Sequence, residues 1–135
     1  MSKKRVLILC TGNSARSQMA EGLLRHDGGD GFEVFSAGTR PGKVRFEAIE
    51  AMSELGIDLS AHRSKHVDEF AGQTFDYVLT VCDNARELCP IFPGAGVMIH
   101  RAFEDPIGIE GFRQVRDDLR KYLRDRFIGG PISST

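Results

Sequence analysis

Apolar residues along the chain fall into two patterns, short continuous runs and longer stretches with helical spacing. Short continuous runs are typical of strands buried on both faces of a parallel sheet, and they predict strands over residues 5–10, 32–35, 75–81 and 97–99. Helical spacing predicts helices over residues 17–26, 43–55 and 110–127. Because strands alternate with helices, we predict an α/β fold with a four-stranded parallel sheet and helices on both of its faces.

The length of the chain fits one domain. It has 135 residues, with no repeat and no Pro/Ser-rich linker between the predicted elements. We therefore predict a single domain over residues 1–135, in which residues 129–135 form a flexible tail. A chain of this size buries roughly two-thirds of its unfolded surface, so it needs no disulfide or zinc ion to fold.

Charge and composition exclude several classes of partner. The 18 basic residues nearly balance the 19 acidic ones, which argues against non-specific binding of nucleic acid. The longest aliphatic run, residues 6–9, is far too short to span a membrane, and no signal-peptide core follows the basic start of the chain. We therefore expect a cytoplasmic protein. In that reducing compartment, the three cysteines indicate chemistry rather than a disulfide scaffold.

The first cysteine begins a loop between the first predicted strand and the first predicted helix. Five residues separate Cys10 from Arg16, and a loop of this length can curl until its backbone N–H groups point inward. Gly12 and Asn13 tolerate the positive φ that such a curl requires. Ligands of parallel sheets bind at the carboxyl ends of the strands. We therefore predict a cup for a tetrahedral oxyanion, lined by Thr11, Gly12, Asn13, Ser14, Ala15 and Arg16.

Cys10 lies at the base of the predicted cup and is our candidate nucleophile. Arg16, the inward amides and the helix N-terminus all favour its thiolate form, and Arg16 can also hold two oxygens of the anion. Ser17 can donate a hydrogen bond to the sulfur. The alternative is a buried strand-end thiol without chemistry, which is the commoner role of a lone cysteine. That alternative explains neither Arg16 nor the strand–loop–helix context.

Three stretches of the sequence carry a family resemblance. They are CTGNSARSQMAEG from Cys10, SAGT from Ser36 and GIDLS from Gly56. Together they resemble the low-molecular-weight tyrosine phosphatase fold, and more closely its arsenate reductase branch of the thioredoxin-coupled type. The resemblance covers residues 4–127. It implies that Cys10 attacks the arsenic of arsenate, for which phosphate and sulfate are analogues.

The resemblance also implies a general acid after the last predicted strand. Members of the family carry an Asp-Pro pair in this loop, and Asp105-Pro106 matches it. Asp105 then protonates the leaving oxygen, and Glu104 is the weaker substitute. An Asp-Pro pair is also a common way to cap a loop, so the assignment depends on its position after the fourth strand.

Cys82 and Cys89 follow the third predicted strand. The resembled thioredoxin-coupled reductases carry a cysteine pair with this spacing at this place, which implies a relay. Cys82 attacks the sulfur of Cys10, Cys89 attacks Cys82, and thioredoxin reduces the resulting disulfide. Relatives that use glutaredoxin or mycothiol share this scaffold, so thioredoxin follows from the resemblance alone. In the alternative interpretation, Cys82 and Cys89 are buried small hydrophobic residues.

The spacing of this pair has a structural consequence. If residues 83–88 form a helical turn, two cysteines seven positions apart are separated by about 10 Å along its axis. A disulfide needs Cα atoms about 4.4–6.8 Å apart. We therefore predict that residues 82–93 rearrange when the pair is oxidised.

The resembled reductases hold a potassium ion under the loop with an Asn, a Glu, a Ser and an Asp. Asn13, Glu21 and Ser36 match the first three, whereas the fourth position is Lys65. A lysine cannot bind a cation, so we expect its ammonium to replace potassium and to pair with Glu21. In the alternative, Lys65 is a solvated surface residue. We expect no resident metal and no tightly bound cofactor.

Two other functions stay open on this evidence. A tyrosine phosphatase of the same fold uses the same nucleophile, arginine and acid, and leaves the other two cysteines idle. A non-enzymatic module would bind an oxyanion or sense redox state without turnover. The phosphatase branch usually places tyrosines beside the Asp-Pro pair, but Phe103 and Ile107 stand here, which disfavours phosphotyrosine as the natural substrate. The sequence therefore favours an arsenate reductase, which we expect to act as a monomer.

Overall fold

The computed structural model describes residues 3–82 and 92–128. Four strands form a sheet in the order β2-β1-β3-β4, and every neighbouring pair is parallel. The strands are β1 (Lys4–Cys10), β2 (Phe32–Gly38), β3 (Phe75–Thr80) and β4 (Ala95–His100). The helices are α1 (Arg16–Gly28), α2 (Phe46–Ser53) and α3 (Gly108–Phe127), with short 3-10 helices η1 (Gly29–Gly31) and η2 (Val67–Phe70). The predicted four-stranded parallel α/β fold is confirmed.

The central strand β1 is buried on both of its faces. Val6 and Ile8 belong to an apolar cluster that includes residues of all three α-helices, whereas Leu7 and Leu9 belong to a second cluster. Successive side chains of a strand point to opposite faces. This double burial is the reason why the apolar run in the sequence is continuous rather than alternating.

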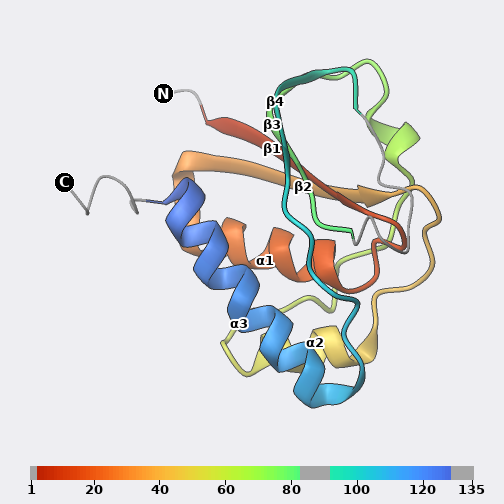
Figure 1. Ribbon diagram of the computed structural model, residues 1–135, viewed down its shortest axis with the longest axis vertical. Coiled ribbons are helices and arrows are strands. Elements are labelled where there is room, and N and C mark those ends of the chain that lie inside the picture. The colour runs from red at the N-terminus through yellow and green to blue at the C-terminus, as the bar shows by residue number, and fades with distance from the viewer. Residues whose placement is uncertain (1–2, 83–91, 129–135) are drawn as a thin grey trace.

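The two faces of the sheet are covered unequally. Helices α1, α2 and α3 lie together on one side of it (Figure 1). On the other face, Phe70 of η2 packs against Phe35 and Phe75, with ring centroids 5.5 and 5.9 Å apart. Helices therefore lie on both faces, as predicted, although in the described part of the chain the second face bears a 3-10 helix and no α-helix.

Charged groups connect α3 to the other two helices. Near the end of α1, Asp27 accepts hydrogen bonds from Arg120 at 2.9 Å and from Arg124 at 3.1 Å. Glu54, which follows α2, accepts from Arg113 and Arg116 at 2.7 Å. These hydrogen bonds lower the pKa of Glu54 to about 2. In the residues described, no helix combines the length and apolar character that a membrane crossing requires.

Some predicted boundaries are wrong by several residues. The helix predicted over residues 43–55 begins only at Phe46 and ends at Ser53. The backbone before it is bound to the loop after β1 instead: the N–H of Gly42 donates to the Gly12 carbonyl at 3.4 Å, and the N–H of Arg45 donates to the Ser14 carbonyl at 2.8 Å. Strands β2 and β4 are longer than predicted because pairing in the parallel ladder continues beyond their apolar residues.

Candidate active site

The carboxyl ends of β1 and β2 lie level with each other, since Cys10 pairs with Gly38 in the sheet register. A Cβ atom on Gly38 would collide with the carbonyl oxygen of Thr11 and lie 2.9 Å from that of Cys10 and 3.0 Å from the Asn13 nitrogen. The loop after β1 therefore rests directly on the backbone of β2. Only a glycine allows this close approach.

The sulfur of Cys10 lies at the bottom of this loop and is bound by two neighbours. The backbone N–H of Asn13 donates to it at 3.3 Å, and the hydroxyl oxygen of Ser17 lies 2.9 Å away. Cys10 is only 2% exposed. Asn13 takes the left-handed conformation, with φ of 48°, whereas Gly12, which we also expected there, has no positive φ. The loop therefore curls at one residue, and the curl turns the Asn13 amide onto the sulfur.

A cavity of about 180 Å³ opens above Cys10. Its walls come from three parts of the chain: the loop after β1, the segment before α2 and the segment after β4. The lining residues are Cys10, Thr11, Gly12, Ser14, Ala15, Arg16, Arg45 and Asp105. Every predicted cup residue except Asn13, which lies behind the loop, lines this cavity.

Arg16 and Asp105 meet at this cavity although they are far apart in the sequence. The Nε of Arg16 is 3.9 Å from a carboxylate oxygen of Asp105. The Arg16 side chain is buried and donates from Nη1 to the carbonyl oxygen of Phe103 at 3.0 Å. The Asp105 side chain is 67% exposed. The fixed guanidinium can hold an anion, and the exposed carboxyl group can serve as its proton donor.

Behind the loop, the four residues of the predicted cation site lie together. The amide Nδ2 of Asn13 donates to Ser36 Oγ at 2.9 Å, and Ser36 donates to Glu21 at 2.5 Å. The Nζ of Lys65 is 4.0 Å from the same Glu21 oxygen. The Lys65 side chain is only 14% exposed, which does not fit a solvated surface lysine. Burial lowers the pKa of Lys65, and the attraction of Glu21 opposes this shift.

His62 is a further neighbour of this cluster. Its Nδ1 lies 2.9 Å from Gln18 Oε1 and 4.0 Å from Glu21 Oε2. Burial lowers the pKa of His62, although the charge of Glu21 acts in the opposite direction. In the described part of the chain, no group of three or more His, Cys, Asp or Glu side chains is arranged to hold a metal ion.

Cys82 lies two residues after the end of β3 and is fully buried. It belongs to the same apolar cluster as Cys10 and takes part in a disulfide bond, while Cys10 is free. The predicted relay partner Cys89 belongs to residues 83–91, which lie outside the described residues. The cysteine relay and the rearrangement over residues 82–93 therefore stay predictions.

Sequence reasoning missed one residue of the cavity, Arg45. It stands at the N-cap of α2, where no motif or short-range spacing connects it to Cys10. Its position depends on the backbone hydrogen bond to the Ser14 carbonyl, which brings the segment before α2 against the loop.

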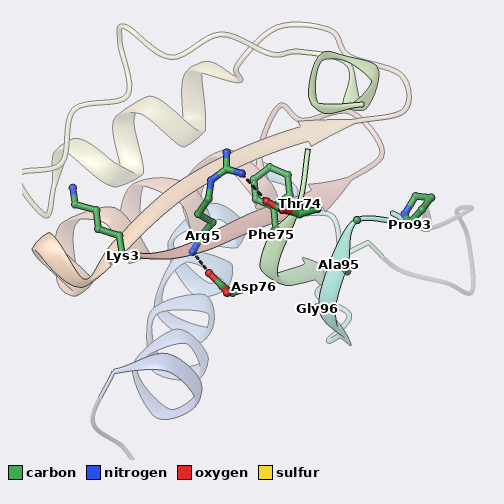
Figure 2. A pocket seen from close by; sticks show the side chains of 9 residues that line it. Lys3, Arg5, Thr74, Phe75, Asp76, Pro93, Ala95 and Gly96 are labelled. Atoms are coloured by element: carbon green, nitrogen blue, oxygen red, sulfur yellow. Dashed lines mark hydrogen bonds between the residues drawn. The ribbon is translucent and has the colours of Figure 1, made fainter. Parts of the chain in front are cut away.

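A larger cavity lies at the opposite end of the sheet (Figure 2). It has a volume of about 580 Å³ and is lined by residues near the amino ends of β1, β3 and β4. Its Arg5 is held by the carbonyl oxygen of Thr74 at 2.6 Å and by Gln73 at 2.8 Å. Cys10 does not line this cavity, so the chemistry expected from Cys10 belongs to the smaller one.

Comparison with known proteins agrees with this geometry. A family model described as low molecular weight phosphotyrosine protein phosphatase matches residues 5–127. The chain belongs to this family. The resemblance inferred from the sequence is therefore confirmed.

Several relatives within the family are arsenate reductases. The chain is 41% identical over 132 residues to the arsenate reductase of Halalkalibacterium halodurans. The aligned region covers 92% of this chain and 95% of that protein. A solved arsenate reductase in its phosphate-binding state superimposes with a TM-score of 0.82 at 32% identity, over 90% of this chain and 95% of that one. The thioredoxin-dependent arsenate reductase of Corynebacterium glutamicum matches with a TM-score of 0.75 at 28% identity, over 97% of this chain and 63% of that one.

Proposed function

We propose that this chain reduces arsenate to arsenite and that thioredoxin supplies the electrons. The observation that carries the proposal is the small cavity in which the Cys10 sulfur faces Arg16 and Asp105. The similarity to arsenate reductases, one of them thioredoxin-dependent, supports the choice of arsenate and thioredoxin. A reductant of this kind operates in a reducing compartment, so we further propose that the protein is cytoplasmic.

The proposed reaction begins at the loop. Arg16 and the loop after β1 hold the arsenate oxygens, while Ser17 and the Asn13 amide stabilise the Cys10 thiolate. The thiolate attacks arsenic and forms a Cys10–arsenic bond. One arsenic–oxygen bond breaks, and Asp105 donates the proton with which that oxygen leaves as water.

Reduction follows when a second thiolate attacks the sulfur of Cys10. In our proposal Cys82 makes this attack, because β3 pairs with β1 and the N–H of Val81 donates to the Leu9 carbonyl at 2.9 Å, one residue before each cysteine. A Cys10–Cys82 disulfide forms, the electron pair of the Cys10–arsenic bond passes to arsenic, and arsenite leaves. Cys89 then attacks Cys82 and releases the Cys10 thiolate. Thioredoxin reduces the Cys82–Cys89 disulfide and closes the cycle.

A phosphatase activity on aryl phosphates is the second candidate, since the chain belongs to a phosphatase family. Phosphate and arsenate have the same shape and charge, so the same cavity admits both. The exposed Ile107, two residues after Asp105, is aliphatic and offers no aromatic ring on which an aryl group could stack. We therefore propose phosphatase chemistry as a weak side activity.

The test is arsenate-dependent oxidation of NADPH in the presence of thioredoxin and thioredoxin reductase. We expect Cys10→Ser, Cys82→Ser and Cys89→Ser each to abolish this turnover. Hydrolysis of p-nitrophenyl phosphate serves as the control, because it needs Cys10 but neither of the other cysteines. Loss of both activities in Cys10→Ser alone, with full arsenate turnover in the other two variants, would contradict the relay. If the wild-type protein hydrolyses p-nitrophenyl phosphate but does not reduce arsenate, the chain is a phosphatase and the proposed function is wrong.

No cofactor or metal takes part in this proposal. We propose instead that the Lys65 ammonium occupies the place under the loop where the resembled reductases hold potassium. Its distance of 4.0 Å from Glu21 and its burial support this role. We also propose that the protein works as a monomer, with arsenate and thioredoxin as its partners and phosphate or sulfate as competing anions.

A further inference from the structure

We infer that Arg45 is a second oxyanion-binding residue, placed at the mouth of the cavity to hold the outward-facing oxygens of the bound anion. This inference rests on the proposed function for the identity of the anion. Among the described residues, eight line the cavity, and Arg16 and Arg45 are the two arginines among them.

The two arginines occupy different depths. The Arg16 side chain is 5% exposed and fixed by the Phe103 carbonyl at the base of the cavity. The Arg45 side chain is 44% exposed, which puts its guanidinium at the solvent side. In our proposal, an anion bound over Cys10 therefore has the buried guanidinium at its inner side and the more exposed one at its outer side.

The position of Arg45 is set by packing rather than by chance exposure. Its guanidinium carbon lies 5.3 Å from the ring centroid of Phe112, which is fully buried in α3. Its backbone N–H is bound to the Ser14 carbonyl at 2.8 Å, so its backbone is joined directly to the loop. The first contact restricts the side chain and the second fixes the backbone that carries it, so both reduce the entropy that binding an anion would cost.

Arg45 also keeps hydrogen-bonding capacity for a ligand. A guanidinium has five N–H donors. Among the described residues, the side-chain hydrogen bond of Arg45 goes to Glu47, at 3.3 Å from Nη2. This contact occupies one of the five donors of a side chain that lines the cavity.

Charge balance explains why a second cation is needed. During the reaction the Cys10 thiolate carries one negative charge, which offsets the charge of Arg16. Asp105 adds no positive charge in either of its protonation states. Arsenate near neutral pH is largely a dianion, so an approach to a net-neutral cup would depend on backbone dipoles alone. Arg45 adds a positive charge to the wall of the cavity, and its ion pair with Glu47 offsets this charge in part.

The test compares Arg45→Gln with Lys43→Gln. Lys43 lies two residues earlier in the same segment, is exposed and does not line the cavity, so the two variants lose the same charge from the same region. We expect Arg45→Gln to raise the KM for arsenate and the dissociation constant for inorganic phosphate by about tenfold, with kcat changed less than twofold. Arg45→Lys should recover part of this loss, and Lys43→Gln should match the wild type.

Binding of inorganic phosphate is measured by calorimetry, which does not depend on any arsenate chemistry. If phosphate binding weakens in Arg45→Gln while no variant reduces arsenate, the inference stands and the proposed function fails. Equal phosphate affinities of Arg45→Gln and Lys43→Gln would overturn the inference, whatever the enzyme reduces. A fall in kcat at unchanged KM would also overturn it, because Arg45 would then act on the chemical step and not on binding. Melting temperatures of all variants identify any loss that comes from unfolding.

Discussion

At the scale of single residues, the ion pair under the loop is the least ordinary feature of the site. Lys65 is mostly buried, and its partner Glu21 is held by Ser36, which in turn contacts Asn13 of the loop. The backbone N–H of Lys65 also donates to the side-chain oxygen of Asn13 at 2.9 Å. The residue that carries the charge therefore contacts the loop through its backbone as well.

Replacing this ammonium by a carboxylate tests whether it substitutes for a metal ion. We expect wild-type activity to be equal in potassium and sodium salts at the same ionic strength. In Lys65→Asp, two carboxylates face each other under the loop, so activity should fall several-fold in sodium and recover in potassium, which takes oxygen ligands. The measurement is the rate of arsenate reduction in each salt.

Lys121→Asp is the control, because Lys121 is 80% exposed on α3. It should respond to the two salts as the wild type does. Clear activation of the wild type by potassium over sodium would show that Lys65 does not replace the ion.

At the scale of secondary-structure elements, the site depends on the close contact between the loop after β1 and the end of β2. The ladder brings Gly38 beneath the loop, and the segment before α2 closes over it through the hydrogen bonds of Gly42 and Arg45. The end of β2 and the segment before α2 therefore fix the backbone of this loop from two sides. The chemistry of Cys10 requires this arrangement because backbone groups cannot be repositioned by a change of rotamer.

Gly38→Ala should displace the loop without unfolding the protein. The added methyl group meets the backbone of Thr11 and Cys10, neither of which can move as a flexible side chain would. We expect a loss of stability of roughly 1–3 kcal/mol and a fall in kcat/KM for arsenate of at least about a hundredfold. Steady-state kinetics and urea unfolding measure the two effects.

Gly42→Ala is the matched control, since a methyl group at Gly42 meets nothing within 4 Å. It should keep both stability and activity. Normal activity in Gly38→Ala would show that the loop tolerates a shift of its support.

The sequence pattern predicts the elements well and the connections between them poorly. The continuous run of β1 and the spacing from Cys10 to Arg16 depend on local rules, and both are found where they were expected. The start of α2 at Phe46 does not follow from periodicity, because hydrogen bonds to the loop compete with helix formation before it. Arg45 was missed for the same reason, since its role depends on a contact with Ser14 that is distant in sequence.

At the scale of the whole molecule, α3 connects the helices of the helical layer. Asp27 of α1 forms ion pairs with α3. The Asp27 side chain is 7% exposed and pairs with Arg120 and Arg124. Burial alone would raise the pKa of Asp27, but hydrogen bonds from Arg120, His26 and Arg124 outweigh it and hold this pKa well below the ordinary value of 3.8. The carboxylate is therefore more acidic in the folded state than in the unfolded one.

This direction fixes how stability depends on pH. A carboxylate with a lowered pKa stabilises the fold above its unfolded value of 3.8 and loses that contribution as the pH falls toward the folded value. We expect Asp27→Asn to lower the free energy of unfolding by about 1–3 kcal/mol at pH 7. The difference from the wild type should stay constant down to about pH 4.5 and shrink below the unfolded value.

Urea unfolding across this pH range measures the effect. Asp125→Asn is the control, because Asp125 forms an exposed pair with Lys121 and should contribute less than about 0.5 kcal/mol. If the difference in free energy of unfolding between Asp27→Asn and the wild type grew as the pH fell, the pKa of Asp27 would not be lowered in the folded state.

In the proposed reaction the cup after β1 holds its anion by the oxygens, and among the described residues that line the cavity only the sulfur of Cys10 bonds to the central atom. Phosphate therefore competes with arsenate for the same binding site, and only the subsequent formation of a bond to sulfur distinguishes the two anions. For an arsenate reductase built this way, detoxification follows the ratio of the two anions rather than the arsenate level alone. A cell starved of phosphate would clear a given dose of arsenate faster than a phosphate-replete one with the same amount of enzyme.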